Sequence, residues 1–192
     1  ALPGLRTALN LPDLRPEECP RGTVLCPPGG LESGSLLRAS VTFLPGAPSH
    51  KSGAPIHVLS GTAAIPGLLF LPPEGVAGED ILADLELASP IVLATGDRLL
   101  VRRPSPGCNL ARGRFLGFAS RRLRTRDEKE RKNLKELAAN LDEPRLRVAA
   151  LLGWLESPVR ARELAAKLGL LEEAVLDDLQ AALADGLVQD LG

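Results

Sequence analysis

The sequence predicts a multi-domain chain, in which an antiparallel β unit is followed by a helical unit. Three observations support this prediction. Most of the 17 prolines and 19 glycines lie in the first 120 residues, where they separate short segments of alternating apolar and polar residues. After residue 126 the apolar spacing becomes that of helices. Aromatic residues make up only 3% of the chain, so its cores must be built from aliphatic side chains.

Residues 1–34 are expected to hold two short strands, at 5–9 and at 22–26. The second one is ended by the run Pro-Pro-Gly-Gly at 27–30. Two strands of this length cannot bury a sheet face by themselves. We therefore interpret this segment as the C-terminal strands of a preceding β-barrel whose beginning lies outside the chain. The chain also lacks an initiator methionine, which indicates a processed chain or an excised fragment.

Residues 35–122 contain seven strand-like segments joined by turns rich in Gly, Pro, Ser and Asp. In the first of them, 36–43, polar residues such as Arg38 face one way, and the opposite face carries Leu37, Ala39, Val41 and Phe43. The others are 55–59, 62–71, 80–87, 91–93, 98–103 and 112–118. Short strands at this spacing, with no helical pattern between them, predict an antiparallel sandwich or barrel.

Residues 123–142 are predicted to form a linker helix. Its charges alternate in sign, with opposite charges four residues apart at Glu128–Lys132 and Lys132–Glu136, and it has few apolar residues. We expect this helix to be mostly solvated.

Residues 143–192 predict a compact helical unit with helices at 145–155, 161–168 and 172–184, Gly169 ending the second. The core face of the first helix is expected to consist of Leu146, Ala149, Ala150, Leu152 and Gly153. The order of the helices is typical of a helix-turn-helix, and the tail from Leu183 to Asp190 would begin the strand of a wing. The sequence therefore predicts a winged-helix domain that lacks its wing.

Charge is distributed unevenly along the chain. The run 98–126 holds nine arginines and no acidic residue, whereas the whole chain has a net charge of −1. A strip of this kind attracts polyanions, of which nucleic-acid phosphate is the commonest in cells. The alternative is that the arginines lie on solvated strand faces and pair with the acidic remainder of the chain. The composition by itself does not decide between these two interpretations.

The helix at 172–184 would enter the DNA major groove in a winged-helix protein. It carries Glu172, Glu173, Asp177 and Asp178, and no Lys or Arg follows Lys167. Acidic side chains facing phosphate would repel it, which argues against groove binding by this helix. A spacer or a protein-binding surface is the alternative that its charge favours.

The candidate RNA-binding residues combine this strip with one loop. They are Arg102, Arg103, Arg112, Arg114, Arg121, Arg122, His50 and Lys51. Alternation along strands sends about half of the arginines to one face, where they could follow a phosphate backbone. His50 could instead be an ordinary exposed loop histidine. We interpret His57 as a structural strand residue, and Asp97 as the cap of the turn before Arg98.

No catalytic or metal-binding pattern is visible. The sequence has no Ser–His–acid set, no glycine-rich phosphate loop and no metal-spaced cluster. Cys19, Cys26 and Cys108 are odd in number and lack zinc spacing, so we expect free thiols in a reducing compartment. No apolar run approaches the length of a membrane span, and the chain does not open like a signal peptide. These features predict a cytoplasmic segment without a membrane partner and without enzyme activity of its own.

Four stretches carry a resemblance to a known family. Gly4-Leu-Arg-Thr-Ala-Leu-Asn-Leu11 and Arg21-Gly-Thr-Val-Leu25 resemble the end of the second domain of translational GTPases. There, a barrel strand reads Arg-x-Ala-Leu-Asn-Leu and is followed by Arg-Gly-x-x-Leu. Ile56-His-Val-Leu-Ser-Gly-Thr-Ala63 and Thr95-Gly-Asp-Arg-Leu-Leu-Val-Arg102 are similar to the third domain of bacterial selenocysteine-specific elongation factors. In that family a winged-helix array follows the third β-barrel. The family's Gly-Gly-Gly-type segment is replaced here by Asn109-Leu-Ala-Arg-Gly-Arg114, which puts the local backbone path in question.

The resemblance implies a translation-factor type of third-domain barrel at 35–122. It also implies a parent protein that carries selenocysteinyl-tRNA to ribosomes paused at UGA codons recoded by a messenger-RNA hairpin. The barrel would help to hold the acceptor and T-stem region of the tRNA. A GTPase domain that binds GTP and Mg²⁺ would precede residue 1. Further winged helices, which bind the hairpin, would follow residue 192. The competing interpretations are a structural docking module and a DNA-binding regulator.

Overall fold

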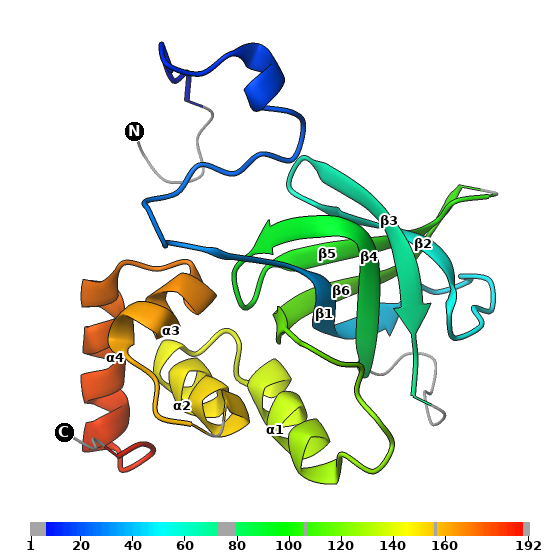
Figure 1. The fold of residues 1–192 in the computed structure, drawn as a ribbon. Helices are drawn as coiled ribbons and strands as arrows, with labels where there is room; N and C mark the ends of the chain where they lie inside the picture. Colours follow the sequence, from blue (N-terminus) through cyan, green and yellow to red (C-terminus); the bar gives the residue numbers. More distant parts are fainter. Residues whose placement is uncertain (1–6, 73–79, 106, 156, 190–192) are drawn as a thin grey trace.

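A computed structural model describes residues 7–72, 80–105, 107–155 and 157–189. Its centre is a closed antiparallel barrel with the strand order β1-β4-β3-β2-β5-β6 (Figure 1). The strands are β1 (Glu32–Phe43), β2 (Ala54–Ser60), β3 (Ala63–Phe70), β4 (Ile81–Leu93), β5 (Arg98–Arg103) and β6 (Cys108–Phe118). The barrel alternative is therefore correct, and it has six strands within the described residues.

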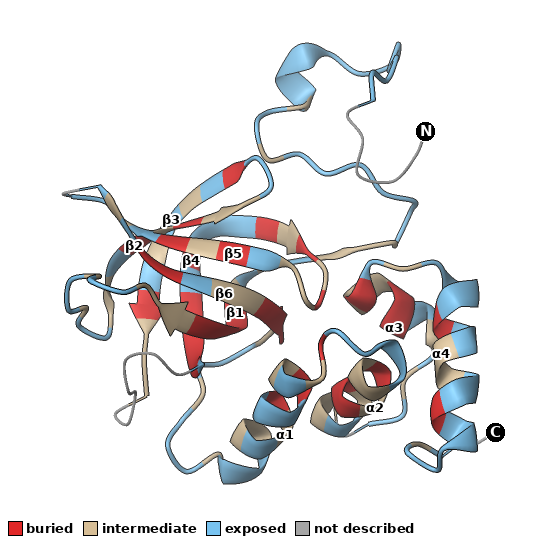
Figure 2. Cartoon of the chain, turned by 180° about the vertical axis from the view of Figure 1, so that it is seen from behind, coloured by how far each residue is buried: buried red, intermediate tan, exposed pale blue. Residues whose placement is uncertain are grey.

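The barrel core comes from the alternation that the sequence predicts. Leu37, Ala39 and Val41 are at most 1% exposed and point inward, and Phe43 packs at the edge of the same core. The buried positions of the neighbouring strands complete the core (Figure 2). Because the cylinder closes, β1 pairs with β4 on one side and with β6 on the other. Closure thus leaves no open sheet edge among the described strands.

One difference from the predicted strands concerns β4. The segments 80–87 and 91–93 are not two strands but one, Ile81–Leu93. Its register with β1 jumps from Glu86 opposite Leu36 to Ile91 opposite Gly34. Pro90, which has no N–H group, lies in this stretch without a ladder partner, so it does not interrupt the strand. The segment that replaces the Gly-Gly-Gly pattern stays within β6, but its register with β5 jumps from Ala111 opposite Val101 to Asn109 opposite Arg102.

Residues 7–31 form no strand, so the prediction of a strand at 22–26 is wrong. The first predicted strand lies partly outside the described residues, and residues 7–9 have no regular structure. The only helical turn in the described part of this segment is the 3₁₀ turn η1 (Pro16–Glu18). Strand 22–26 fails because no neighbouring segment pairs with it within the described part of the protein. The segment contacts the barrel through Arg21, whose Nε donates to the Thr62 carbonyl at 2.7 Å.

Four helices follow the barrel in the described residues: α1 (Glu128–Ala139), α2 (Pro144–Leu155), α3 (Ala161–Leu168) and α4 (Glu172–Ala184). Helix α1 is exposed on most of its surface, as predicted. However, Leu134 and Leu137 are fully buried against the other helices, so it packs as part of the helical unit. Gly169 ends α3 in the left-handed conformation, with φ of 63°.

The predicted core face of α2 is mostly wrong. The buried residues are Val148, Ala150 and Leu151, whereas Gly153 is exposed. Apolar residues surround this helix almost evenly, because it packs against both α1 and α4, so periodicity could not select the face. Residues 186–189 after α4 are not in a strand, and the rest of the predicted wing strand lies outside the described residues. No described helix is long and apolar enough to cross a membrane.

The helical unit lies directly against the barrel. The outward-facing Leu82 and Leu116 of the barrel belong to the helical core. A Cβ atom added to Gly117 of β6 would lie 2.2 Å from the Trp154 ring of α2, so only glycine permits this approach. At the other end of the interface, Lys167 of α3 donates to Glu32 of β1 at 2.8 Å. Because the helices cover this part of the barrel, only the rest of its outer surface is open to solvent.

Candidate nucleic-acid interface

The register of β5 and β6 places arginines side by side on the outer surface of the barrel. Leu99 and Val101 of β5 point into the core. Because side chains alternate along a strand, Arg98, Leu100 and Arg102 point outward. Arg98 lies opposite Arg114, and Leu100 lies opposite Arg112. The outer face of this strand pair therefore carries Arg98, Arg102, Arg112 and Arg114. These arginines share one side of the strand pair, and Asp80 lines the same hollow as Arg98, Arg112 and Arg114.

Two of the predicted RNA-binding arginines are engaged within the protein. The guanidinium of Arg114 donates to the Gly96 carbonyl at 2.7 Å and to Asp142 at 3.0 Å. The guanidinium of Arg121 donates to Asp127 and, at 3.1 Å, to Glu130. Both arginines therefore connect the barrel side to the segment around α1.

The hydrogen bonds that Asp127 accepts change the pKa of its carboxyl group. The Arg124 N–H group, followed by the Arg121 side chain, lowers the pKa of Asp127 below its ordinary value of 3.8. Its hydrogen bond with Asp127 in turn raises the pKa of Arg121. Asp127 is thus ionised at neutral pH and competes with any phosphate for Arg121.

Other predicted arginines have no ion-pair partner among the described residues, namely Arg102, Arg103, Arg112 and Arg122. Arg112 is exposed and lines a hollow of about 440 Å³ together with Arg98 and Thr42. The guanidinium of Arg122 lies 4.2 Å from the centre of the Phe70 ring, a cation–π contact that leaves its N–H groups available. These side chains are available for phosphate.

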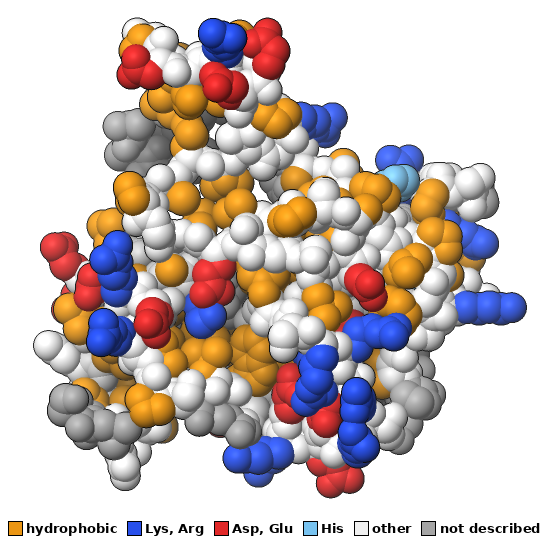
Figure 3. Space-filling model, viewed as in Figure 1, with side chains coloured by type: hydrophobic (Ala, Val, Ile, Leu, Met, Phe, Trp, Pro, Cys, Tyr) orange, Lys and Arg blue, Asp and Glu red, His pale blue; other side chains and the backbone are white. Residues whose placement is uncertain are grey.

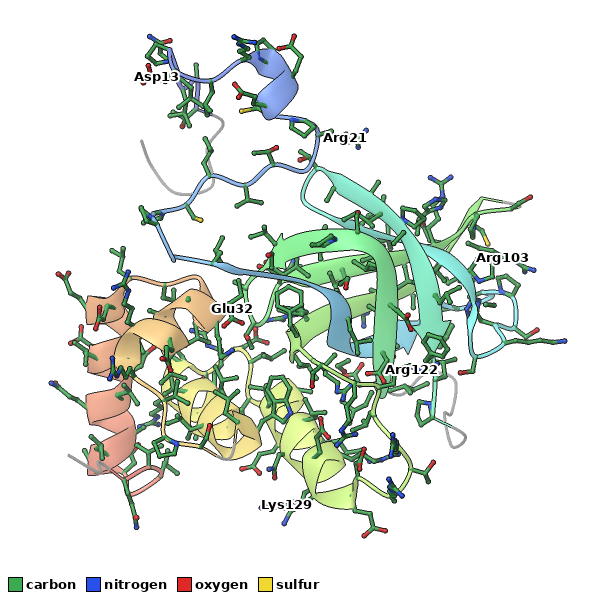
Figure 4. The ribbon with its side chains drawn as sticks, in the orientation of Figure 1. Asp13, Arg21, Glu32, Arg103, Arg122 and Lys129 are labelled. Carbon is green, nitrogen blue, oxygen red and sulfur yellow. The ribbon has the colours of Figure 1, made fainter. Side chains whose placement is uncertain are left out.

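Arg122 lies at the edge of a second hollow, where the barrel meets the segment leading to α1 (Figure 4). Its volume is about 490 Å³, and its basic lining consists of Arg121, Arg122, Arg124 and Arg131. Figure 3 shows Lys and Arg side chains gathered in this region, with acidic side chains among them. A second group of basic side chains therefore lies at residues 121–131.

His50, Lys51 and Arg103 meet in a third hollow, of about 430 Å³. His50 and Lys51 come from the loop before β2, and Arg103 ends β5. The prediction grouped these residues only by charge, whereas barrel closure brings them together. Burial lowers the pKa of His50 below 6.5, and the Arg103 charge lowers it further. His57 is separate, since it lies on β2 opposite Arg102. As predicted, Asp97 caps its turn by accepting from the Ala94 N–H group at 2.8 Å.

One buried polar cluster was not found from the sequence. Arg38 and Asp84 are 2% and 4% exposed and form an ion pair between β1 and β4. Arg38 also donates to the Arg121 carbonyl at 2.8 Å and to Glu130 of α1 at 3.1 Å. The alternation placed Arg38 on the outer face, and it is there, but α1 covers it. The sequence feature that could have indicated this cluster is a single arginine, Arg38, between the apolar strand residues Leu37 and Ala39.

The exposed surface of α4 has the opposite charge. Glu172, Glu173 and Asp177 are exposed, and no Lys or Arg follows Lys167 in the sequence. Leucines are also exposed along this helix and just beyond its ends: Leu171, Leu176, Leu183 and Leu187. An acidic, apolar surface is unsuited to a phosphate backbone, which disfavours a DNA-reading role for α4.

Comparison with known proteins identifies a relative. No family model matches the chain. The chain is 30% identical over 192 residues to a selenocysteine-specific elongation factor of Desulfomicrobium baculatum. The alignment covers 98% of this chain, and the chain spans 28% of the length of that relative. The predicted resemblance is therefore confirmed, because the similarity includes both the barrel and the helices.

Proposed function

Because the chain is homologous to part of a selenocysteine-specific elongation factor, we propose that it is a segment of such a factor and binds tRNA through its barrel. The parent protein would bring selenocysteinyl-tRNA to the ribosome at recoded UGA codons in the cytoplasm. GTP and Mg²⁺ would bind to a GTPase domain outside this chain. The messenger hairpin would bind to winged helices outside it, and residues 143–189 would link those helices to the barrel.

The observation that carries the RNA proposal is the group of exposed arginines that have no ion-pair partner among the described residues. Arg102 and Arg112 lie on the β5–β6 face, whereas Arg122 lies over Phe70 of β3, in the hollow beside the segment that leads to α1. A-form RNA is recognised largely through phosphates and 2′-hydroxyls, which suits guanidinium groups presented by strands. Each phosphate neutralised by such a group releases counterions, so binding should weaken as salt concentration rises.

The test is a tRNA-binding measurement over a salt series with the triple variant R102A/R112A/R122A. We expect lower affinity and a smaller salt slope, by about one for each phosphate that the variant no longer neutralises. The matched control is R145A/R160A/R162A, which removes the same charge from the helical unit. Equal effects of the two triple variants would indicate a net-charge effect and refute the proposal, as would an unchanged affinity and slope in R102A/R112A/R122A. Arg114 and Arg121 are left intact because each of them forms an ion pair within the protein.

A second candidate function is protein docking by α4, for which the exposed leucines are the specific observation. Leu176 and Leu183 are 43% and 38% exposed and are seven residues apart, which places them on one side of the helix. Glu172 and Asp177 are exposed on the same helix. We propose that this surface binds a protein segment that presents apolar side chains flanked by Lys or Arg, because that charge pattern complements the acidic border.

A synthetic amphipathic peptide of Leu and Lys is a suitable probe, with a Leu and Glu peptide as its control. Calorimetry should show binding of the Lys peptide alone, and L176N/L183N should abolish it. Equal binding of both peptides, or binding that L176N/L183N leaves intact, would refute the proposal. A concentration-dependent dimer that disappears in the same variant would assign the surface to a second copy of the chain instead.

A further inference from the structure

The hollow of about 490 Å³ between the barrel and the segment that leads to α1 has a strongly positive lining. Four arginines line it: Arg121, Arg122, Arg124 and Arg131. The acidic residue that lines it among the described residues is Asp84. Asp84 is 4% exposed and forms an ion pair with Arg38, so its charge is already balanced from within the barrel. The hollow is therefore suited to an anion.

Arg121 is one of these arginines, and its guanidinium is already engaged. Its Nη1 donates to the carboxylate of Asp127, and its Nη2 donates to the carboxylate of Glu130 at 3.1 Å. An arginine that binds a phosphate group commonly presents two such nitrogens to two phosphate oxygens. The two carboxylates at the start of α1 therefore occupy the donors that a phosphate in this hollow would use.

These two ion pairs can be exchanged without unfolding the contact between α1 and the barrel. The Arg121 side chain is 49% exposed, so water screens both pairs. Each carboxylate also keeps a second partner when Arg121 leaves. The Arg124 N–H group donates to Asp127 at 2.9 Å, and the Arg38 guanidinium donates to Glu130 at 3.1 Å. A phosphate that takes Arg121 therefore leaves neither carboxylate without a hydrogen bond.

We propose that Asp127 and Glu130 are internal competitors of RNA: they hold Arg121 in the free protein, and an RNA phosphate in the hollow takes Arg121 from them. The inference rests on the proposed RNA-binding function and deepens it, because it names what limits the affinity of one RNA contact. The hollow then binds RNA less tightly than its four arginines would allow, and neutralising the two carboxylates increases the affinity.

The experiment measures the binding of a labelled tRNA to the full chain and to D127N/E130Q by fluorescence anisotropy. Asn and Gln remove the negative charge but keep an oxygen that accepts from the Arg124 N–H group and from Arg38. We expect D127N/E130Q to bind tRNA about three- to fivefold more tightly, since exposed ion pairs compete only weakly. The salt slope should increase by about one, because Arg121 then neutralises a further phosphate.

Two comparisons separate local competition from the general effect of removing acids. E128Q/E136Q is the matched control, because it removes two exposed carboxylates of α1 that are not ion-pair partners of Arg121 in the described part of the chain. It should increase the affinity less than D127N/E130Q does. In an R121A background the two double variants should have equal effects, since no guanidinium remains to be released. Trp154 fluorescence checks that each variant is folded, and D127N against E128Q gives the same comparison with single substitutions.

Two results would overturn this inference and leave the proposed function standing: no greater gain in tRNA affinity from D127N/E130Q than from E128Q/E136Q, or a greater gain that persists in the R121A background. In both cases the loss of affinity in R102A/R112A/R122A would still support RNA binding. If neither the unmodified chain nor D127N/E130Q binds tRNA, the proposed RNA-binding function fails, and the inference fails with it.

Discussion

Replacing Arg38 by methionine should lower the free energy of unfolding by about 3–5 kcal/mol, the usual effect of removing one partner of a buried ion pair. Arg38 is 2% exposed and Asp84 4%, so the remaining carboxylate could not be solvated without opening the interface. Asp84 would keep one hydrogen bond, from the Leu123 N–H group at 2.6 Å. The substitution also removes the hydrogen bonds that Arg38 donates to the Arg121 carbonyl and to Glu130 of α1.

Denaturant unfolding followed by tryptophan fluorescence measures this effect, since Trp154 is the single tryptophan and packs against β6. The double variant R38M/D84L should be less destabilised than R38M, because it leaves no unpaired buried charge. The control is R145M, which breaks an exposed pair with Asp185 and should change stability by about 1 kcal/mol or less. If R38M costs no more than R145M, the assignment of Arg38 as a buried anchor is refuted.

Two further predictions concern the same interface. G117A would place a Cβ 2.2 Å from the Trp154 ring and should cost about 1–3 kcal/mol with a red-shifted emission, whereas G153A, which meets no atom within 4 Å, should leave the emission unchanged. An unshifted G117A spectrum would refute the close contact. Asp127 has a lowered pKa, so its stabilising contribution is complete above pH 3.8 and is lost as the pH falls through its folded-state value. D127N should therefore be less stable at pH 7 and show a weaker decline in stability on acidification; a pH profile parallel to that of the unmodified chain would contradict this.

Local signals in the sequence were sufficient for most elements of the fold. β5, α3 and α4 begin and end at the predicted residues. Each is bounded by a turn or capping residue, such as Gly169. The prediction of a strand at 22–26 was wrong because an alternating pattern shows which side chains would share a face, but not whether another strand is present to pair with it. The prediction of the buried face of α2 was mostly wrong because a helix with apolar residues on all sides contains no periodic signal.

The candidate site could be predicted by residue type but not by arrangement. Charge identified the arginines of the β5–β6 face, and alternation indicated that about half of them share a side, but the register of the strands was needed to show which ones do. Neither signal relates His50 to Arg103, which become neighbours only when β2 pairs with β5. Neither signal shows that α1 covers Arg38, because that depends on how the helical unit packs on the barrel. Contacts between distant segments determine which arginines remain available.

The acids that neutralise this strip come mainly from one short segment, and this decides how the strip can work. Asp127, Glu130 and Asp142 all lie within 127–142, whose net charge is only −1 because its own basic residues balance them. They engage Arg38, Arg114 and Arg121, and in doing so they hold the helices on the barrel. An RNA phosphate approaching Arg121 would have to displace two carboxylates, whereas Arg112 has no ion-pair partner among the described residues, although Asp80 lines the same hollow. Within the run 98–126, the arginines that form ion pairs, Arg114 and Arg121, are therefore different residues from those that the RNA proposal requires.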